Sequence, residues 1–310
     1  MNEIEMIFKN KPSALYILWK AFKTKKSAYS SDVKYPIIHV SRKGFVINKA
    51  HVEAFHKVCD IKQYDCLHML YPFTLVYPYI MQVLSSKEIP VSMFKVLNTH
   101  NCIKMHRYIF PDELIDIDCF NSSMRIIPKG LELDIKSIIS SKGENVWENI
   151  TTYFYPGKFG PADASYSSPR LDLINDAPVI NKWYLPAKNR FRFARISGDT
   201  NGIHYVSFYA RVMGFKRDFA QPIRVVAKCV SSLPIAHGIK SWLEELNDSC
   251  IISRPRTPAA LPKELDFYLK GPVYYDNTLI LKNIKTEKGN RFDLYCNDES
   301  KPAISGMLYL

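Results

Sequence analysis

The chain lacks any pair of cysteines spaced as C-x-x-C. Its seven cysteines are odd in number and lie scattered along 310 residues. This distribution excludes a regular disulfide framework and argues against a cysteine-rich zinc site. Reduced thiols of this kind are typical of a cytoplasmic protein, which is the location we expect.

An export signal is also missing. The chain starts with Glu3 and Glu5, and its first apolar run, from Ala14 to Trp19, is too short for the core of a signal peptide. The one stretch with the length of a membrane span, Leu67 to Leu84, contains two prolines, a histidine and a glutamine. We therefore interpret it as the buried helix of a globular domain and expect no integral membrane segment.

No nucleic-acid-binding module and no basic stripe is recognisable, although 42 Lys and Arg outnumber 30 Asp and Glu and give a formal charge of +12. The basic residues are dispersed, so we do not expect a nucleic-acid partner. The excess charge is explained by solubility alone, by an anionic membrane or by an acidic substrate carrier. Intrinsic disorder is excluded, because 47% of the residues are hydrophobic and 23% are charged.

The length predicts two domains. Residues 1–30 contain an amphipathic lead-in helix at 13–26 that ends in lysines, for which a membrane-surface helix is the alternative interpretation. We place a first unit at 31–155, a Pro-, Gly-, Ser- and Asp-rich linker at 156–178, and a second unit at 179–310.

Each unit combines one or two helices with several strands, which is an α+β pattern with grouped strands. Helices are expected at Asn48–Val58 and Leu67–Leu84 in the first unit, and after Pro186, at Tyr205–Met213 and at Val225–Leu246 in the second. Strands are expected at Lys34–Val40, Met93–Thr99, Leu114–Phe120, Leu131–Ser140, Val146–Tyr155, Asn181–Leu185, Glu264–Leu269, Thr278–Lys285, Arg291–Asn297 and Ala303–Leu310.

The segment with the strongest chemical signal is FARISGDTNGIHYVSFYA, residues 193–210. Gly198 permits a tight turn, and Asp199 and Asn201 are residue types that favour turns and helix caps. His204 follows five residues after Asp199. Taken alone, the pattern is also compatible with a capping Asp near a capping His.

The order of these residues resembles the signature of the MaoC-like, (R)-specific enoyl-thioester hydratases, S-G-D-x-N-P-(aliphatic)-H followed by Ala. Here it reads Ser197 to His204, with Ala210 at the expected place and Gly202 where the family has Pro. A second family landmark, G-F-x-R-x-I-A-H-G, is matched by residues 214–222, with Gln221-Pro222 in place of the final His-Gly. Another A-H-G, at Ala236-His237-Gly238, lies too far downstream and is interpreted as a helix break or cap.

The resemblance extends over nearly the whole chain beyond residue 30. LYPFTLVYPYIMQVL (70–84) is similar to the central helix of the N-terminal half of two-hotdog members, and KVLNTHNCIKMHRYI (95–109) and NVWENITTYF (145–154) are similar to its strands. The layout most resembles the double-hotdog 3-hydroxyacyl-thioester dehydratases. The implied fold is a double hotdog, in which each unit is an antiparallel sheet wrapped around a central helix.

The reaction implied by the resemblance is the reversible syn addition of water to a trans-2-enoyl thioester, giving a (3R)-3-hydroxyacyl thioester. Asp199 and His204 would be the catalytic pair sharing one water, with Asn201, Gly198, Ala220 and Gln221 binding or orienting the substrate. The N-terminal unit, which lacks the signature, would accommodate the acyl chain. No metal and no cofactor are implied beyond the CoA or phosphopantetheine of the substrate, so the expected partners are acyl-CoA or an acidic acyl carrier protein, with a homodimer possible.

The departure at Pro222 bears on the mechanism. In the family, the backbone N–H of the final Gly polarises the thioester carbonyl, and proline has no N–H. Gln221 could supply a donor instead, from its backbone or its side chain. Two alternatives to the hydratase therefore stay open: a catalytically weak or inactive acyl-thioester-binding protein, and a thioesterase on the same scaffold.

Overall fold

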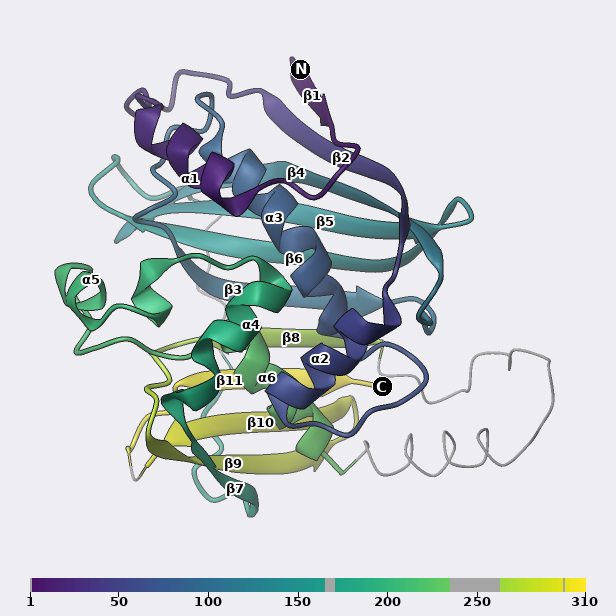
Figure 1. The fold of residues 1–310 in the computed structure, drawn as a ribbon. Coiled ribbons are helices and arrows are strands. Elements are labelled where there is room, and N and C mark those ends of the chain that lie inside the picture. The colour runs from purple at the N-terminus through teal and green to yellow at the C-terminus, as the bar shows by residue number, and fades with distance from the viewer. Residues whose placement is uncertain (1, 165–170, 235–262, 298) are drawn as a thin grey trace.

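The computed structural model describes residues 2–164, 171–234, 263–297 and 299–310. Within them, eleven strands form one sheet in the order β1-β2-β4-β5-β6-β3-β8-β11-β10-β9-β7 (Figure 1). The strands are β1 Glu3–Ile7, β2 Ile37–Val46, β3 Leu97–Met105, β4 Leu114–Ile127, β5 Gly130–Ser141, β6 Glu144–Pro156, β7 Val179–Leu185, β8 Glu264–Leu269, β9 Asn277–Thr286, β10 Gly289–Cys296 and β11 Ile304–Tyr309. The helices are α1 Ala14–Lys23, α2 Lys49–Cys59, α3 Tyr71–Ser85, α4 Arg190–Ser197, α5 Ser207–Val212 and α6 Pro222–Ser232, with short 3₁₀ turns η1 Ala187–Asn189 and η2 Gly202–His204.

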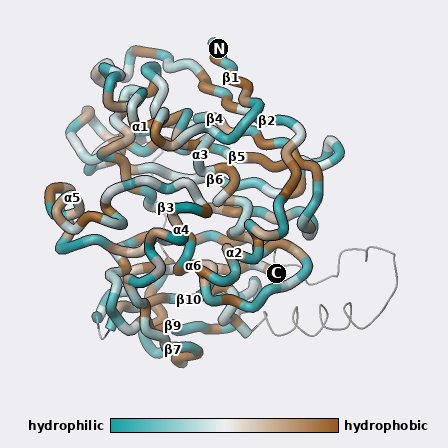
Figure 2. Tube along the Cα trace, viewed as in Figure 1, coloured by the Kyte–Doolittle hydropathy of each residue, from teal (hydrophilic) through white to brown (hydrophobic). Residues whose placement is uncertain are grey.

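The N-terminal unit wraps β2, β4, β5, β6 and β3 against helix α3. The burial pattern of β5 shows that one face of the sheet covers the core: its residues alternate regularly between buried and partly exposed. Figure 2 shows the same alternation of apolar and hydrophilic residues along the strands. The helix is fixed to the sheet by Trp147 of β6, which is fully buried and donates from Nε1 to the Met69 carbonyl at 2.9 Å.

Helix α3 is buried along almost its whole length. Only Tyr77 and Met81 of its fifteen residues escape full burial. An apolar helix of this kind requires protein on all sides, which the curved sheet and helices α1 and α4 supply. The two exceptions lie on the side of α3 that faces the C-terminal unit's helix α4 and the cavities described below.

The C-terminal unit repeats this arrangement with β8, β11, β10, β9 and β7 around α6 (Figure 1). Helix α6 starts with Pro222 at its first position, where a missing N–H costs nothing. Antiparallel pairing of β3 with β8, in which Ile103 faces Leu265, joins both units into one sheet. The predicted α+β double hotdog is therefore confirmed.

Residues 171–178, the second part of the sequence-predicted linker, lie across β10. Arg291 donates from Nη2 to the Asp172 carbonyl at 2.8 Å, and the Ile174 N–H donates to Asp293 Oδ2 at 3.2 Å. Every residue of β10 is buried, because this segment covers the strand's outer side.

Most predicted elements are confirmed, including the lead-in helix α1 and helix α2, which begins after its predicted cap Asn48. Some predicted bounds were wrong. The strand predicted at Met93–Thr99 lies at Leu97–Met105, and helix α6 begins at Pro222 instead of Val225. Strand β1, which pairs parallel to β2, was not predicted. The rest of the helix predicted to reach Leu246, together with Ala236-His237-Gly238, lies outside the described residues.

The stretch from Leu67 to Leu84 forms helix only from Tyr71 onward, because its first residues build the turn before Pro72. None of the helices in the described part of the chain has the length and apolar character needed to cross a membrane. The six cysteines within the described residues are free thiols, and five of them are buried.

Strand β11 passes so close to two aromatic rings that only glycine fits at position 306. A Cβ at Gly306 would lie 2.4 Å from the Phe292 ring and 3.1 Å from the Phe267 Cβ. We expect Gly306→Ala to lower the free energy of unfolding by about 1–3 kcal/mol, measured by urea denaturation. Gly271→Ala is the matched control, since its Cβ would meet its nearest neighbour at 4.0 Å. Equal stability of both variants would contradict this packing.

Candidate active site

Asp199 and His204 of the C-terminal unit lie side by side, next to helix α3 of the N-terminal unit. Asp199 lies two residues after the end of helix α4, and His204 ends the 3₁₀ turn η2. Their side chains are almost completely buried, and His204 Nε2 lies 3.6 Å from Asp199 Oδ2. This separation is too long for a direct hydrogen bond, so each atom retains the capacity to bind a third group placed between or beside them.

The carboxylate of Asp199 is held by two donors on its other oxygen. Oδ1 accepts from the backbone N–H of Asn201 at 2.9 Å and from the hydroxyl of Tyr77 at 3.0 Å. Tyr77 belongs to helix α3 of the N-terminal unit, so the Asp of one unit is oriented by the other. With Oδ1 occupied in this way, Oδ2 is the oxygen that faces His204.

The tautomer of His204 follows from its neighbours. Nδ1 lies 2.9 Å from the carbonyl oxygen of Phe219, which only accepts hydrogen bonds, so Nδ1 carries the proton. In the neutral ring Nε2 is then unprotonated and acts as a proton acceptor. The imidazole therefore presents its basic nitrogen to the space beside Asp199.

The turn at Ser197-Gly198-Asp199 places the carboxylate. Gly198 has a φ of +75°, in the left-handed region that glycine occupies without strain, and its N–H closes the end of α4 by donating to the Ala194 carbonyl at 2.7 Å. The Ser197 hydroxyl accepts from the Asp199 N–H at 3.1 Å. On the far side of the turn, the Tyr205 hydroxyl donates to the Asp199 carbonyl at 2.7 Å.

His51 of α2 fixes the end of α4 from the opposite direction. Its Nε2 donates to the Ile196 carbonyl at 3.0 Å, and its Nδ1 accepts from the Tyr71 hydroxyl at 2.9 Å. The three helices α2, α3 and α4 are thereby connected within one residue of the signature turn. His51 therefore bridges the helices that carry the site.

Gln221 is the residue before α6, and its side chain makes two hydrogen bonds within the protein. Its Nε2 donates to the Tyr205 hydroxyl, and its Oε1 accepts from the Tyr275 hydroxyl at 3.3 Å. The backbone N–H of Gln221 has no hydrogen-bond acceptor among the described residues. Because Pro222 has no N–H, Gln221 and Ile223 carry the nearest backbone donors at this end of the helix.

The tyrosines that surround Asp199 remain protonated. Burial, followed by the neighbouring Asp199 carboxylate, raises the pKa of Tyr77 well above its ordinary value. Burial and Asp199 also raise the pKa of Tyr205. Both hydroxyls therefore act as neutral donors toward Asp199 and not as bases.

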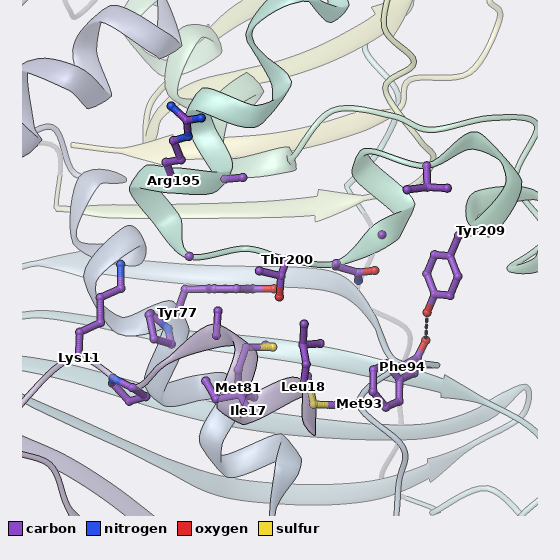
Figure 3. Close-up of a pocket in the computed structure, with 18 residues that line it drawn as sticks. Lys11, Ile17, Leu18, Tyr77, Met81, Met93, Phe94, Arg195, Thr200 and Tyr209 are labelled. Atoms are coloured by element: carbon purple, nitrogen blue, oxygen red, sulfur yellow. Dashed lines mark hydrogen bonds between the residues drawn. The ribbon is translucent and has the colours of Figure 1, made fainter. Parts of the chain in front are cut away.

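Two adjacent cavities meet at this site. Cavity 2, of about 330 Å³, contains Asp199, His204 and Gln221 together with Phe73, Tyr153 and Lys270. Cavity 1, of about 780 Å³, lies on the other side of Asn201 and is drawn in Figure 3, with Lys11 and Arg195 toward one end and Tyr209 at the other. Four residues line both cavities and form the partition between them: Tyr77, Met81, Met93 and Asn201.

The structure brings most of the sequence-predicted site residues together. Asn201 caps η2 by accepting from the Ile203 N–H at 3.3 Å. Gly198 lines cavity 1, and Gln221 lines cavity 2. Ala220 is buried behind the cavity wall, where its N–H donates to the Val273 carbonyl at 2.8 Å, and it does not line either cavity.

Sequence reasoning missed the hydroxyls that hold Asp199. Tyr77 lines both cavities, and its hydrogen bond to Asp199 joins residues that are 122 positions apart in the sequence. No local pattern reports such a distant pairing. Among the described residues, no group of three or more His, Cys, Asp or Glu side chains is placed to hold a metal ion. The expectation that no cofactor is needed stays a prediction.

Gly202, which replaces the family's proline, is explained by Tyr209. A Cβ at position 202 would lie 2.8 Å from the Tyr209 ring, which packs over the backbone here and donates to the Phe94 carbonyl at 3.4 Å (Figure 3). The large ring and the missing side chain therefore compensate each other.

This compensation predicts energetic coupling. We expect Gly202→Ala to destabilise the protein by about 1–3 kcal/mol in the wild-type background, because the ring must move. The same change made together with Tyr209→Ala should cost less than the sum of the two single variants, as measured by a double-mutant cycle of unfolding free energies. Additive values would contradict the contact.

The fold and this arrangement define a class of protein. Two hotdog units share one sheet, and only the second carries a buried Asp and His on a signature turn next to an apolar cavity. No protein-family model matches the chain.

Comparisons with individual proteins agree with the resemblance found in the sequence. The chain is 23% identical over 187 residues to 3-hydroxyacyl-thioester dehydratase X of Mycobacterium tuberculosis, a match that spans 60% of this chain and 66% of that relative's length. The crystal structure of HtdX from the same organism superposes with a TM-score of 0.69 at 19% identity, covering 88% of this chain and 100% of the other.

Two further solved structures share the fold. A MaoC-like dehydratase from Phytophthora capsici has a TM-score of 0.65 at 13% identity, covering 89% of this chain and 96% of the other. A Mycobacterium tuberculosis protein described as having a double hotdog fold has a TM-score of 0.56 at 10% identity, covering 92% and 99%. The chain is thus similar to MaoC-like dehydratases and has their double-hotdog fold.

Proposed function

We propose that the protein is an (R)-specific 3-hydroxyacyl-thioester dehydratase that also catalyses the reverse reaction, the hydration of a trans-2-enoyl thioester. The observation that supports it most is the pairing of His204 Nε2 with Asp199 Oδ2 at 3.6 Å. The other ring nitrogen, His204 Nδ1, and the other carboxylate oxygen, Asp199 Oδ1, already have hydrogen-bond partners. The two free atoms face the same space, so a single water can contact both.

The reaction then proceeds on one face of the substrate. His204 Nε2 accepts a proton from the water while its oxygen bonds to C3 of the enoyl group and the C2–C3 π electrons move toward the thioester carbonyl. The imidazolium, stabilised by the Asp199 carboxylate, returns that proton to C2. The π bond is lost, one C–O bond and one C–H bond are gained, and the catalytic pair is restored. Because water and proton come from the same pair, addition is syn.

Removing either member of the pair should abolish hydration with little effect on folding. We expect Asp199→Asn and His204→Ala to lower kcat by about 10²–10⁴-fold, the usual contribution of a positioned acid or base. Enoyl-CoA hydration followed by absorbance loss measures this. Matched controls are Asp65→Asn and His106→Ala, which alter an exposed aspartate and a histidine far from the cavities.

Three other outcomes would count against the assignment. Equal rates in all variants would remove the catalytic role of the pair. Tight binding of acyl thioesters without any 3-hydroxyacyl product would favour the inactive binding protein, and release of free thiol without hydration would favour the thioesterase.

We assign the carbonyl-polarising donor to the backbone N–H of Gln221. Gln221 lines cavity 2 and its backbone N–H has no acceptor among the described residues, whereas its side-chain amide is held by Tyr205 and Tyr275. The loss of the family's glycine N–H at position 222 is then compensated by the preceding residue.

The assignment predicts a small kinetic effect where the family pattern is restored. Pro222→Gly adds an N–H at the position of the family's glycine, yet kcat should change by less than about tenfold, because a donor is already present. Stability should fall by about 1 kcal/mol, since glycine replaces a favourable first helical residue. A rise in kcat of about 10²-fold or more would show instead that Pro222 had removed the essential donor.

The acyl chain is proposed to lie against α3 of the N-terminal unit. Phe73, Tyr77 and Met81 of this helix line the cavity that contains the catalytic pair, and Met81 stands at the partition to cavity 1. An acyl chain extending past Met81 would enter the larger cavity. The thioester carrier, CoA or an acidic acyl carrier protein, would then approach from the end of cavity 2 marked by Lys270.

A bulkier side chain between the two cavities should lower activity on long acyl chains more than on short ones. Met81→Trp adds volume where the two cavities meet, so kcat/KM for long-chain enoyl-CoA should fall at least about tenfold while that for crotonyl-CoA stays nearly unchanged. Met81→Leu, which conserves volume, is the matched control and should keep the wild-type chain-length profile. An equal loss with both substrates would place the acyl chain elsewhere.

A further inference from the structure

Helix α1 presents large apolar side chains to solvent on one face. Leu15, Trp19 and Phe22 are 78%, 55% and 85% exposed, and their i, i+4, i+7 spacing puts them on one stripe. The opposite side of the helix is already packed against the protein through the buried residues Ile17 and Ala21. Because both sides are apolar, the helix has the composition of an element that is covered on two sides.

Helix α5 carries a second exposed apolar pair. Phe208 and Val212 are 76% and 67% exposed and, four residues apart, point to the same side. Both helices border cavity 1: Ile17 and Leu18 of α1 line it together with Tyr209 of α5 (Figure 3). In Figure 1 both lie on the left of the molecule, and in Figure 2 both carry apolar residues. We call these five exposed side chains the α1–α5 surface.

Positive charge is concentrated in the two segments that build this surface. Residues 6–31 contain six lysines and no acidic residue. Residues 187–218 contain seven Lys and Arg against two aspartates. Both aspartates are buried; Asp218 is paired with Arg190 and Asp199 belongs to the catalytic site. The exposed cations of these two segments include Lys23, Lys25, Arg192, Arg195 and Arg211.

We propose that the α1–α5 surface binds an anionic lipid bilayer. Apolar side chains that include a tryptophan, flanked by lysines on the same helix, match the chemistry of the interface between lipid tails and charged headgroups. Lys23 also lies over the Trp19 ring, its Nζ 4.8 Å from the centroid, which places the cation at the edge of the apolar stripe. Trp19, Leu15 and Phe22 enter the acyl region, and the cations contact headgroup phosphates.

A bilayer fits this surface better than another protein does. A symmetric dimer would bring two copies of the same cation-rich surface together, and the like charges of the two copies repel each other. An acidic carrier protein would satisfy the cations, but a charged surface is a poor cover for three large apolar side chains. An anionic bilayer satisfies both kinds of group at once.

The position of the surface gives it a role that rests on the proposed function. Cavity 1 is lined by Ile17 and Leu18 of α1 and by Tyr209 of α5, the two helices that carry the surface. A bilayer bound there would lie next to this cavity, so a long acyl chain could pass between the lipid and the catalytic pair. The binding itself requires no substrate and is tested without one.

Vesicle binding of the full-length chain tests the proposal. We expect the wild-type protein to cosediment with vesicles containing phosphatidylglycerol but not with pure phosphatidylcholine vesicles, and to be released by salt. The triple variant Leu15→Ser, Trp19→Ser, Phe22→Ser should bind at least about tenfold more weakly. The double variant Leu114→Ser, Val179→Ser, which alters exposed apolar residues at 58% and 53%, should bind like wild type.

Thermal unfolding and enoyl-CoA hydration of each variant keep the result interpretable. The three α1 side chains are exposed and outside the cavities, so the triple variant should stay folded and hydrate crotonyl-CoA at the wild-type rate. Absence of wild-type binding to anionic vesicles would overturn the proposal, as would equal binding by the triple variant. A wild-type dimer that the triple variant dissociates, or an acidic carrier protein that competes for α1, would assign the surface to that partner instead. Failure of hydration alone would overturn only the proposed function.

Discussion

The organisation of the site depends on the stabilisation of one buried carboxylate. Asp199 is 7% exposed, and a charge in such a place needs hydrogen-bond donors or it destabilises the fold. One donor, the Asn201 N–H, comes from the signature turn itself, and the other, the Tyr77 hydroxyl, comes from the opposite unit. The orientation of Asp199 therefore depends in part on the packing of the two hotdog units against each other. The N-terminal unit, which lacks the Asp and His signature, therefore helps to hold the site in addition to lining the cavity.

Sequence alone gave a good account of everything local. The Asn48 cap, the Ser197-Gly198-Asp199 turn and the strands from Leu114 to Pro156 follow from residue type and periodicity, because each is decided within a few neighbours. The family resemblance supplied the pairing of Asp199 with His204, and the structure places these side chains together. The order of the strands in the sheet, by contrast, was not predicted, because the resemblance implied only the double-hotdog fold.

Contacts between residues far apart in the chain could not be predicted from the sequence. Nothing near Tyr77 indicates that its hydroxyl reaches Asp199, and nothing near Gln221 indicates that Tyr205 and Tyr275 hold its amide. Strand β1 was missed because its pairing to β2 is parallel and its residues are mostly exposed, so it lacks the alternation of a half-buried strand. The two departures from the family motif are explained by the three-dimensional structure. Gly202 leaves room for the Tyr209 ring. Pro222 is the first residue of α6, and the residue before it, Gln221, has a backbone N–H.

The central claim is that one water, held by Asp199 and His204, is added to an enoyl thioester from a single face. The most direct test is hydration of crotonyl-CoA in D₂O, with the product's configuration at C2 and C3 determined by NMR. The account predicts the (3R)-3-hydroxyacyl thioester with one deuteron at C2 on the same face as the new oxygen. Deuterons on both faces of C2, anti placement, or free thiol without hydroxyacyl product would contradict it.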